Sequence, residues 1–347
     1  MNRFIENIRA FVELGNIIKE RKISTYSAMI EEVVCSQSVK NHWFMPVFIH
    51  YALDAIAFML NEENLGKLPE KYATVKSADF DKRETIAVIS PGNIPLAGFH
   101  DFFSVLVSGN HYQGKLSEHD NLLLPMIAKI LTEIQPQLAE RISFVDRIEK
   151  FDKVIATGSN NSSRYFEYYF GQYSHILRKN RNSLAILSGS ETEKELEGLF
   201  HDIFLYFGLG CRSVSHLFLP KGYTFDQMFA VFERLGKEIA MHHHYLNNLE
   251  YQKTVHLMNA IPFQDSGIAL FVEDKRLASP ISVIHYQYYS SEEEIKTYLE
   301  AEKENLQCVV GGNSQLFGNA IPFGSAQQPA IDDFPDGVDV IKWAITA

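Results

Sequence analysis

The stretch TIAVISPGNIPLAGFHDFFSVLVSGNHYQGK, residues 85–115, decides the fold of this chain. A β-branched run at 85–90 is followed by the turn PGN, a helix-like segment and a second candidate strand at 111–115. The alternation continues with a helical pattern at 121–134 and strand-like runs at 141–145 and 152–157. Strands that alternate with helices predict a doubly wound, mostly parallel α/β sheet. Such sheets bind ligands in the turns at the carboxyl ends of their strands.

Different patterns lie on either side of this stretch. Residues 1–66 have helical periodicity, and 44–60 is apolar on most faces, which predicts a buried helix. A new α/β unit begins near Asn180, with a strand at 183–187, an amphipathic helix and a strand at 214–220. Ser190 and Glu193 have the spacing of a capping box for that helix. The C-terminal VDVIKWAITA, residues 338–347, is strand-like.

Composition excludes several classes of protein. A net charge of −11 over 347 residues argues against a general nucleic-acid or anionic-membrane binder. No apolar run reaches the roughly 20 residues of a membrane span. Three scattered cysteines are too few for a disulfide framework or a zinc site, so we expect no metal. We therefore expect a soluble protein of a reducing cytoplasm.

Cys211, in FGLGCRSVSHLF, lies on a glycine-rich turn between the predicted helix and the strand at 214–220. Two readings are open. The thiol is either a small apolar group whose reactivity is not used, or a nucleophile, which needs a position within reach of a substrate.

Four segments in order resemble the aldehyde dehydrogenase superfamily, and within it the acyl-CoA reductases, including the fatty-acid reductase of bacterial luminescence. They are residues 86–110, 114–120, 154–159 and 181–220. The resemblance runs from about residue 72 to the C-terminus. It implies a Rossmann-type cofactor domain, an α/β catalytic domain and a small β oligomerisation extension.

The resemblance also implies the domain limits. Residues 1–70 and 87–179 would form the N-terminal helices and the dinucleotide-binding domain, and 180–332 the catalytic domain. Residues 71–86 and 333–347 would form a hairpin and a C-terminal strand that join a partner subunit, which predicts a homodimer.

By the same resemblance, Cys211 is the nucleophile and Asn93 donates its amide to the oxyanion, although an asparagine is also an ordinary turn residue there. The cofactor is NADPH or NADH. The residues expected to bind it are Ser90, Pro91, Lys115, Ser117, Glu118, Gly158 and Ser159. Without a cofactor, Lys115 and Glu118 would be a solvated surface pair and Ser159 a helix cap.

The sequence departs from the superfamily where oxidising members carry a glutamate that activates water. The matching stretch, YSHILRKNRNS, has Leu177 and no carboxylate, with His175 as the nearby titratable group. A second glutamate is also missing, near Arg276. Slow hydrolysis would suit reduction of an acyl-CoA to an aldehyde. One alternative is an aldehyde or semialdehyde dehydrogenase that acts oxidatively, with His175 as the candidate base. The other is a catalytically silent member.

Overall fold

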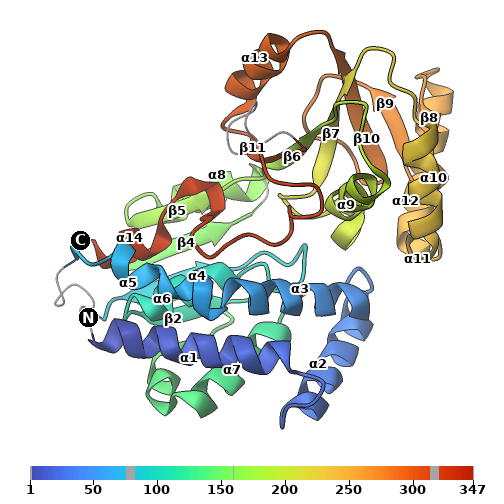
Figure 1. Cartoon of the computed structure of the whole chain (residues 1–347). Coiled ribbons are helices and arrows are strands. Elements are labelled where there is room, and N and C mark those ends of the chain that lie inside the picture. The colour runs from blue at the N-terminus through green and yellow to red at the C-terminus, as the bar shows by residue number, and fades with distance from the viewer. Residues whose placement is uncertain (1, 76–82, 159, 313–319, 347) are drawn as a thin grey trace. The chain divides into compact units, whose positions relative to one another are not determined.

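The computed structural model describes residues 2–75, 83–158, 160–312 and 320–346, with residues 2 and 160–163 described by their backbone alone. The chain forms two compact units (Figure 1). Unit 1 comprises residues 1–179 and 328–347, and unit 2 comprises residues 180–327. The chain therefore passes into unit 2 between Lys179 and Asn180 and returns to unit 1 after Gln327.

The N-terminal part of unit 1 is helical, as its periodicity predicts. The helices, drawn in blue in Figure 1, are α1 (Asn2–Lys19), α2 (Ser27–Lys40), α3 (Pro46–Met59), α4 (Glu62–Gly66) and α5 (Leu68–Lys71). Helix α3 is buried along most of its length, because apolar residues occupy nearly every face.

A five-stranded sheet with strand order β3-β2-β1-β4-β5 forms the centre of unit 1. Its parallel strands are β1 (Thr85–Ile89), β2 (His111–Lys115), β3 (Ile142–Phe144), β4 (Lys153–Thr157) and β5 (Ser174–Arg178). The intervening helices are α6 (Phe99–Val107), α7 (Leu123–Ile134), the 3-10 helix η2 (Pro136–Arg141) and α8 (Asn160–Phe170). The strand order reverses between β1 and β4, so right-handed crossovers require α6 and α7 on one face and α8 on the other. The predicted doubly wound sheet is confirmed.

The C-terminal segment differs from its prediction. In place of the strand predicted within 333–347, a 3-10 helix η4 (Pro335–Gly337) precedes helix α14 (Val340–Ile345), which packs on α6 (Figure 1). The Lys153 ammonium, on β4, bonds the carbonyls of Trp343, Ala344 and Thr346. A cation at the carbonyl end of a helix satisfies groups that the helix leaves open. Residues 76–82 of the hairpin predicted at 71–86 lie outside the described residues.

Unit 2 contains a six-stranded sheet with strand order β11-β6-β7-β10-β9-β8. Its strands are β6 (Asn182–Ile186), β7 (Val214–Pro220), β8 (Gln264–Asp265), β9 (Leu270–Glu273), β10 (Val283–Tyr289) and β11 (Leu306–Gly311). All pair in parallel except β8, which is antiparallel to β9. The helices are α9 (Glu193–Phe204), η3 (Leu205–Gly208), α10 (Asp226–Leu235), α11 (Lys237–Ala240), α12 (His243–Met258) and α13 (Glu292–Glu302).

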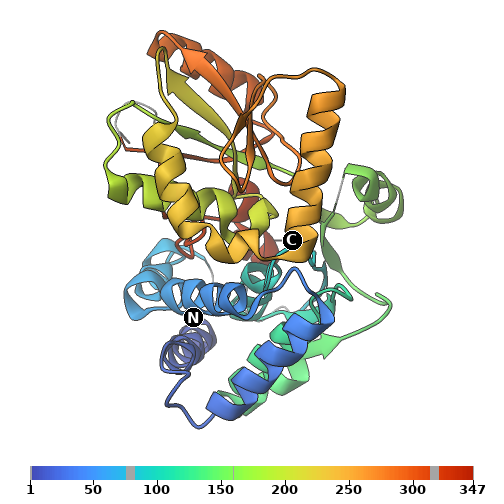
Figure 2. The same cartoon turned by 90° about the vertical axis from the view of Figure 1, so that its right-hand side faces the viewer.

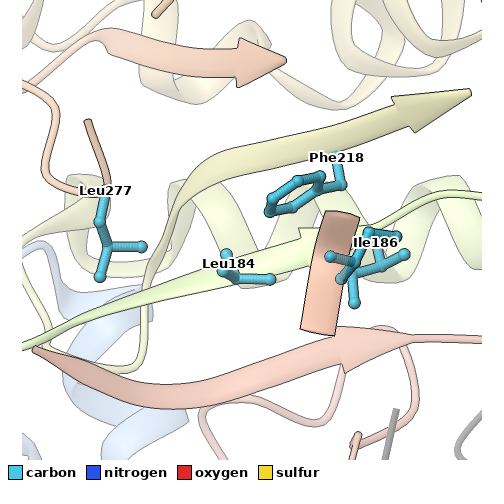
Figure 3. Close-up of a cluster of buried hydrophobic side chains, with 5 residues drawn as sticks. Leu184, Ile186, Phe218 and Leu277 are labelled. Carbon is cyan, nitrogen blue, oxygen red and sulfur yellow. The ribbon is translucent and has the colours of Figure 1, made fainter. Parts of the chain in front are cut away.

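Helices cover both faces of this sheet. On one face, Ile295 of α13 belongs to a buried cluster with Leu184, Ile186, Phe218 and Leu277 (Figure 3). Figure 2 shows the other face, along which the golden helices α10 and α12 lie. There the buried rings of α9 and α10 pack together and reach the sheet: Phe204, Phe232 and Phe271.

Two buried histidines lie next to each other in this sheet. His216 on β7 and His285 on β10 are paired in register, and both Nδ1 atoms lie near the Arg276 carbonyl oxygen, at 3.1 and 2.9 Å. Because a carbonyl only accepts, both rings carry their proton on Nδ1. Burial lowers the pKa of both histidines, that of His216 to about 4. Both rings are therefore neutral at pH 7.

Removing the Lys153 ammonium should destabilise unit 1. Lys153→Met leaves the end of α14 without its cation and Glu84, 2.8 Å from the ammonium, without its partner. Loss of one member of a buried ion pair costs about 3–5 kcal/mol, and we expect about 3 because Glu84 is partly exposed. Urea unfolding measures the change. Lys67→Met, which removes an exposed ion pair with Glu63, should cost less than about 1 kcal/mol; equal losses would contradict this role of Lys153.

Unit 2 should lose stability in mild acid. His216 binds a proton in the unfolded chain near pH 6.5 but in the folded chain only near pH 4. The contribution of His216 to the free energy of unfolding is therefore fully present above pH 6.5. It is lost as the pH falls towards 4, by about 3 kcal/mol in total. Urea unfolding at several pH values should show that the free energy of unfolding falls less in acid for His216→Gln than for wild type. Some decrease should remain, because His285 is still present. His243→Gln, at an exposed position, serves as the control. If the free energy of unfolding of His216→Gln depends on pH as in wild type, His216 is not a cause of the acid sensitivity.

Candidate functional site

The loop after β1, residues 90–98, carries Asn93, which is exposed. Further along this loop Leu96 adopts a left-handed backbone, with φ of 59°, and donates its N–H to the Asp120 carboxylate at 2.7 Å. Asp120 is buried in the loop that follows β2. Burial raises the pKa of Asp120 to about 7, although the Leu96 N–H favours the carboxylate and lowers it. A buried side chain of one loop therefore shapes the loop that carries Asn93.

The loops after β1 and β2 touch directly. A Cβ atom at Gly92 would lie 2.3 Å from the Ser117 hydroxyl oxygen, so only glycine fits there. Ser90 donates its N–H to the Lys115 carbonyl at 3.1 Å. The structure thus brings five of the predicted cofactor residues to adjacent strand ends: Ser90, Pro91, Lys115, Ser117 and Glu118. Lys115 and Glu118 are exposed, and Ser90 is buried.

Gly158 lies at the end of β4, next to β1. Its N–H donates to the Arg178 carbonyl at 3.3 Å, so this amide is already engaged. Arg178 is held in turn by a buried bidentate ion pair with Asp101 of α6, at 2.5 and 2.8 Å. Ser159 lies outside the described residues.

The described members of the predicted cofactor set share one edge of the sheet. They lie at the carboxyl ends of β2, β1 and β4, next to the point where the strand order reverses, and open α/β sheets bind dinucleotides at such points. The hydroxyls of Ser90 and Tyr112 are both buried and lie next to each other, and apart from this mutual contact neither has a hydrogen-bond partner among the described residues. Two buried hydroxyls that share one contact leave hydrogen-bonding capacity for a ligand or water.

Other residues lie at or near the positions where the superfamily's two glutamates are missing. His175 is exposed on β5, with Nδ1 2.8 Å from the Tyr173 carbonyl, and Leu177 is half-buried on the same strand. Arg276 is exposed in unit 2 and paired with Asp274 at 2.5 Å, which holds the pKa of that carboxyl at about 2. Within the described ranges, no cluster of three or more His, Cys, Asp or Glu could hold a metal ion. In the same ranges no helix is long and apolar enough to cross a membrane.

In unit 2, the segment between α9 and β7 has a strained backbone. Tyr206, Phe207 and Gly208 are all left-handed, with φ of 56°, 55° and 75°. Such a conformation costs about 1–2 kcal/mol for each residue other than glycine. Packing compensates: the Phe207 ring is buried and stacks on Tyr245 with ring centroids 5.3 Å apart. The chain reverses here and exposes Cys211 on the turn before β7.

A buried serine fixes the backbone of Cys211. Ser183, on β6, donates its hydroxyl to the Cys211 carbonyl at 3.0 Å and accepts the N–H of Cys308 at 3.2 Å. A hydroxyl has one proton, so the contact between Ser183 and the Cys308 sulfur, at 3.1 Å, has the thiol as donor. The Ser183 hydroxyl is thus fully satisfied, and it ties the Cys211 turn to β6 and β11.

Asp120 and Ser183 were not among the functional residues that the sequence pointed to. The signal for Asp120 was weak: a carboxylate two residues after Glu118 and just before the apolar run at 122–124. Ser183 has no sequence signal, because its role depends on strands brought together by the fold.

Comparison with solved structures gives the fold. The chain superposes on an aldehyde dehydrogenase 21 of Physcomitrella patens, solved with the product succinate, with a TM-score of 0.59 and 13% identity over 98% of this chain and 87% of that one. An indole-3-acetaldehyde dehydrogenase of P. syringae, solved with NAD⁺, gives a TM-score of 0.63 and 14% identity over 90% and 72%. Aldehyde dehydrogenase C of Pseudomonas syringae, solved with NAD⁺ and octanal, gives 0.63 and 12% over 94% and 76%. The fold is that of aldehyde dehydrogenases.

Comparison with sequences gives the family. No curated protein sequence matches the chain. The sequence profile of the family described as acyl-CoA reductase (LuxC) matches residues 70–261, which is more than half of the 347-residue chain. The match spans the predicted cofactor residues, Asn93 and the Cys211 turn. This protein is therefore an oxidoreductase that belongs to the acyl-CoA reductase (LuxC) family.

Proposed function

We propose that this enzyme reduces an acyl-CoA thioester to an aldehyde with NADPH or NADH, through a thioester formed on Cys211. The observation that carries the proposal is the exposed thiol on a strained turn whose backbone is tied to the sheet by Ser183. A nucleophile needs both access and a fixed position. Membership of the acyl-CoA reductase family supports the substrate class.

The first half of the reaction uses Cys211 alone as nucleophile. Its thiolate attacks the acyl carbonyl, a new carbon–sulfur bond forms, and the bond to CoA breaks. CoA leaves as a thiolate that takes up a proton, and the acyl group stays on the enzyme as a thioester of the same oxidation level.

The second half needs two electrons. Residues at the carboxyl edge of the unit 1 sheet would hold the reduced dinucleotide: Ser90, Pro91, Lys115, Ser117, Glu118 and Gly158. The resemblance adds Ser159, which lies outside the described residues. When bound, this cofactor supplies the hydride that takes the acyl group to the aldehyde level. The bond to Cys211 then breaks, and the aldehyde leaves a thiolate ready for the next cycle.

Asn93 would stabilise the charge that develops in both halves. Each half passes through a tetrahedral species with a negative oxygen, and the Asn93 side chain carries two N–H donors for it. Its exposed place on a loop fixed by Asp120 supports this role, because preorganised donors need no reorientation during the reaction.

The missing carboxylates favour reduction over hydrolysis. Water attacks an acyl-enzyme slowly unless a base activates that water. Leu177 stands where the oxidising relatives are expected to carry their glutamate, so the thioester should survive until it is reduced.

We also propose a homodimer in a reducing cytoplasm. Cys35 and Cys211 are exposed thiols, which an oxidising compartment would attack. The exposed rings Tyr165, Tyr168 and Tyr169 on α8 are of the type that protein interfaces bury. The dimer was first predicted from a C-terminal strand, but that segment forms helix α14. The exposed rings on α8 are now the basis for expecting a dimer.

Cys211→Ala should abolish turnover, with a loss of at least about 10³-fold, because it removes the thiol proposed to carry the acyl chain. Cofactor oxidation with a series of acyl-CoAs measures this, with NADPH and NADH compared side by side. Mass spectrometry of wild type mixed with acyl-CoA alone should find the acyl group on Cys211. Cys35→Ala, at an exposed thiol of α2, is the matched control and should keep full activity.

Turnover that survives Cys211→Ala would remove this residue from its role. Acid formed from free aldehyde and NAD⁺ without CoA would point to the oxidative reaction. No turnover with any acyl-CoA and no acyl adduct would point to a silent member of the family.

Asn93→Ala should lower kcat by about 10²–10³-fold, the usual effect of losing one oxyanion donor. KM for acyl-CoA should change little, since the donor acts mainly on the transition state. Steady-state kinetics with one acyl-CoA measures both. Asn247→Ala, at an exposed position of α12, should behave as wild type. A larger effect on KM than on kcat in Asn93→Ala would mean that the residue binds substrate instead.

A further inference from the structure

We propose that Asp202 is a positioning residue for the nucleophile: it holds residues 324–327, here called the strap, and the strap in turn holds the two residues that follow Cys211. This inference rests on the proposed role of Cys211. All of the contacts that carry it lie within unit 2.

Asp202 binds the strap through both carboxylate oxygens. It lies on α9 with 1% of its surface exposed, and it accepts the N–H of Gly324 at 2.6 Å and that of Ala326 at 2.9 Å. Burial raises the pKa of Asp202 to about 7, while the two N–H donors and the nearby Arg212 lower it. Hydrogen bonds to a carboxylate are about twice as strong as neutral ones. A buried carboxylate is costly unless it is hydrogen-bonded, and these two hydrogen bonds explain how Asp202 is accommodated.

The strap begins directly against α9. A Cβ atom at Gly198 would lie 2.7 Å from the Phe323 carbonyl carbon and 2.8 Å from the Gly324 nitrogen. Gly324 has a φ of 84°, a conformation that other residues rarely adopt. Two glycines thus let the two backbones meet, and Asp202 fixes the contact that they allow.

The strap holds the Cys211 turn on its other side. Arg212 donates Nε–H to the Ala326 carbonyl at 2.5 Å, and Gln327 donates its side-chain amide to the Ser213 hydroxyl at 3.2 Å. Ala326 is therefore bound twice, by Asp202 at its N–H and by Arg212 at its carbonyl. With Ser183 on the Cys211 carbonyl, three consecutive residues of the turn each have an anchor.

The contacts of the strap bear on the position of the Cys211 sulfur. A reacting sulfur has to be held within about 0.5 Å of its productive position, and a displacement of about 1 Å costs on the order of 10²-fold in rate. Release of the strap would leave the thiol accessible but less well oriented. We therefore expect loss of Asp202 to lower kcat and to leave KM for acyl-CoA nearly unchanged.

The test compares Asp202→Ala with Asp202→Asn. Alanine removes both acceptors, and kcat should fall at least about tenfold. Asparagine keeps one acceptor oxygen and should lie between alanine and wild type. A second readout does not use activity: the rate of iodoacetamide alkylation of Cys211 by peptide mass spectrometry, with Cys35 as internal reference. Alanine should change the Cys211 rate and the pH midpoint of its profile, while Cys35 stays constant.

Arg234→Met is the matched control, because Arg234 binds Glu193 and Glu197 on the same helix from the exposed side. It should leave both readouts at wild-type values. If Asp202→Ala does not fold, Gln327→Ala removes the strap contact to Ser213 alone and should shift both readouts in the same direction.

A folded Asp202→Ala with wild-type kcat and wild-type Cys211 alkylation, in a protein whose Cys211→Ala form is inactive, would overturn this inference and leave the proposed function intact. If Cys211→Ala keeps its activity, the proposed function fails instead. A changed alkylation rate in Asp202→Ala would then still support the positioning of the turn.

Discussion

Backbone N–H groups in buried irregular segments need acceptors, and in each unit a buried aspartate supplies them. Asp120 accepts from Leu96 in the loop that carries Asn93, and Asp202 accepts from the strap beside the Cys211 turn. Burial raises the pKa of both carboxyls to about 7, and the N–H donors act against this rise because they favour the carboxylate. The shape of each candidate reactive segment is therefore set by a side chain from a different element. Local sequence alone would not hold either segment in place.

The layered part of the fold could be predicted from the sequence because it depends on local patterns. The strands at 85–89, 111–115, 153–157 and 214–220 were visible as short β-branched or apolar runs between turns, and their order gave a parallel α/β sheet. This order predicts one edge of the sheet as the ligand-binding edge, since the carboxyl ends of neighbouring parallel strands lie together. The individual cofactor residues came from the family resemblance. The anchors of the turn could not be predicted. Ser183 lies 28 positions from Cys211, and the strap more than a hundred from Asp202.

Two predictions were wrong, the C-terminal strand and the Ser190–Glu193 capping box. In both places the sequence carries signals for more than one structure. Residues 338–347 have β-branched residues typical of a strand, but Asp339 caps a helix there and Lys153 satisfies its carbonyl end. This local cap and the distant Lys153 together favour the helix. At α9, Ser190 with Glu193 and Thr192 with Glu195 have the same capping-box spacing, and the structure uses the second pair. Glu191 binds the Ser188 and Gly189 amides, so the chain is still in a loop at Ser190.

Two consecutive left-handed residues lie in front of the candidate nucleophile. Tyr206 and Phe207 prefer helical or extended backbone, yet both are left-handed, and their rings are buried. A sequence selected for stability alone would place glycine or asparagine at such positions. Burial of the two large rings stabilises the left-handed backbone at this chain reversal, because a change of backbone conformation would also expose the rings to water. Local preference and global fold disagree most often at functional sites. The disagreement at 206–207 is therefore an argument, independent of family resemblance, that the turn carrying Cys211 is held for chemistry.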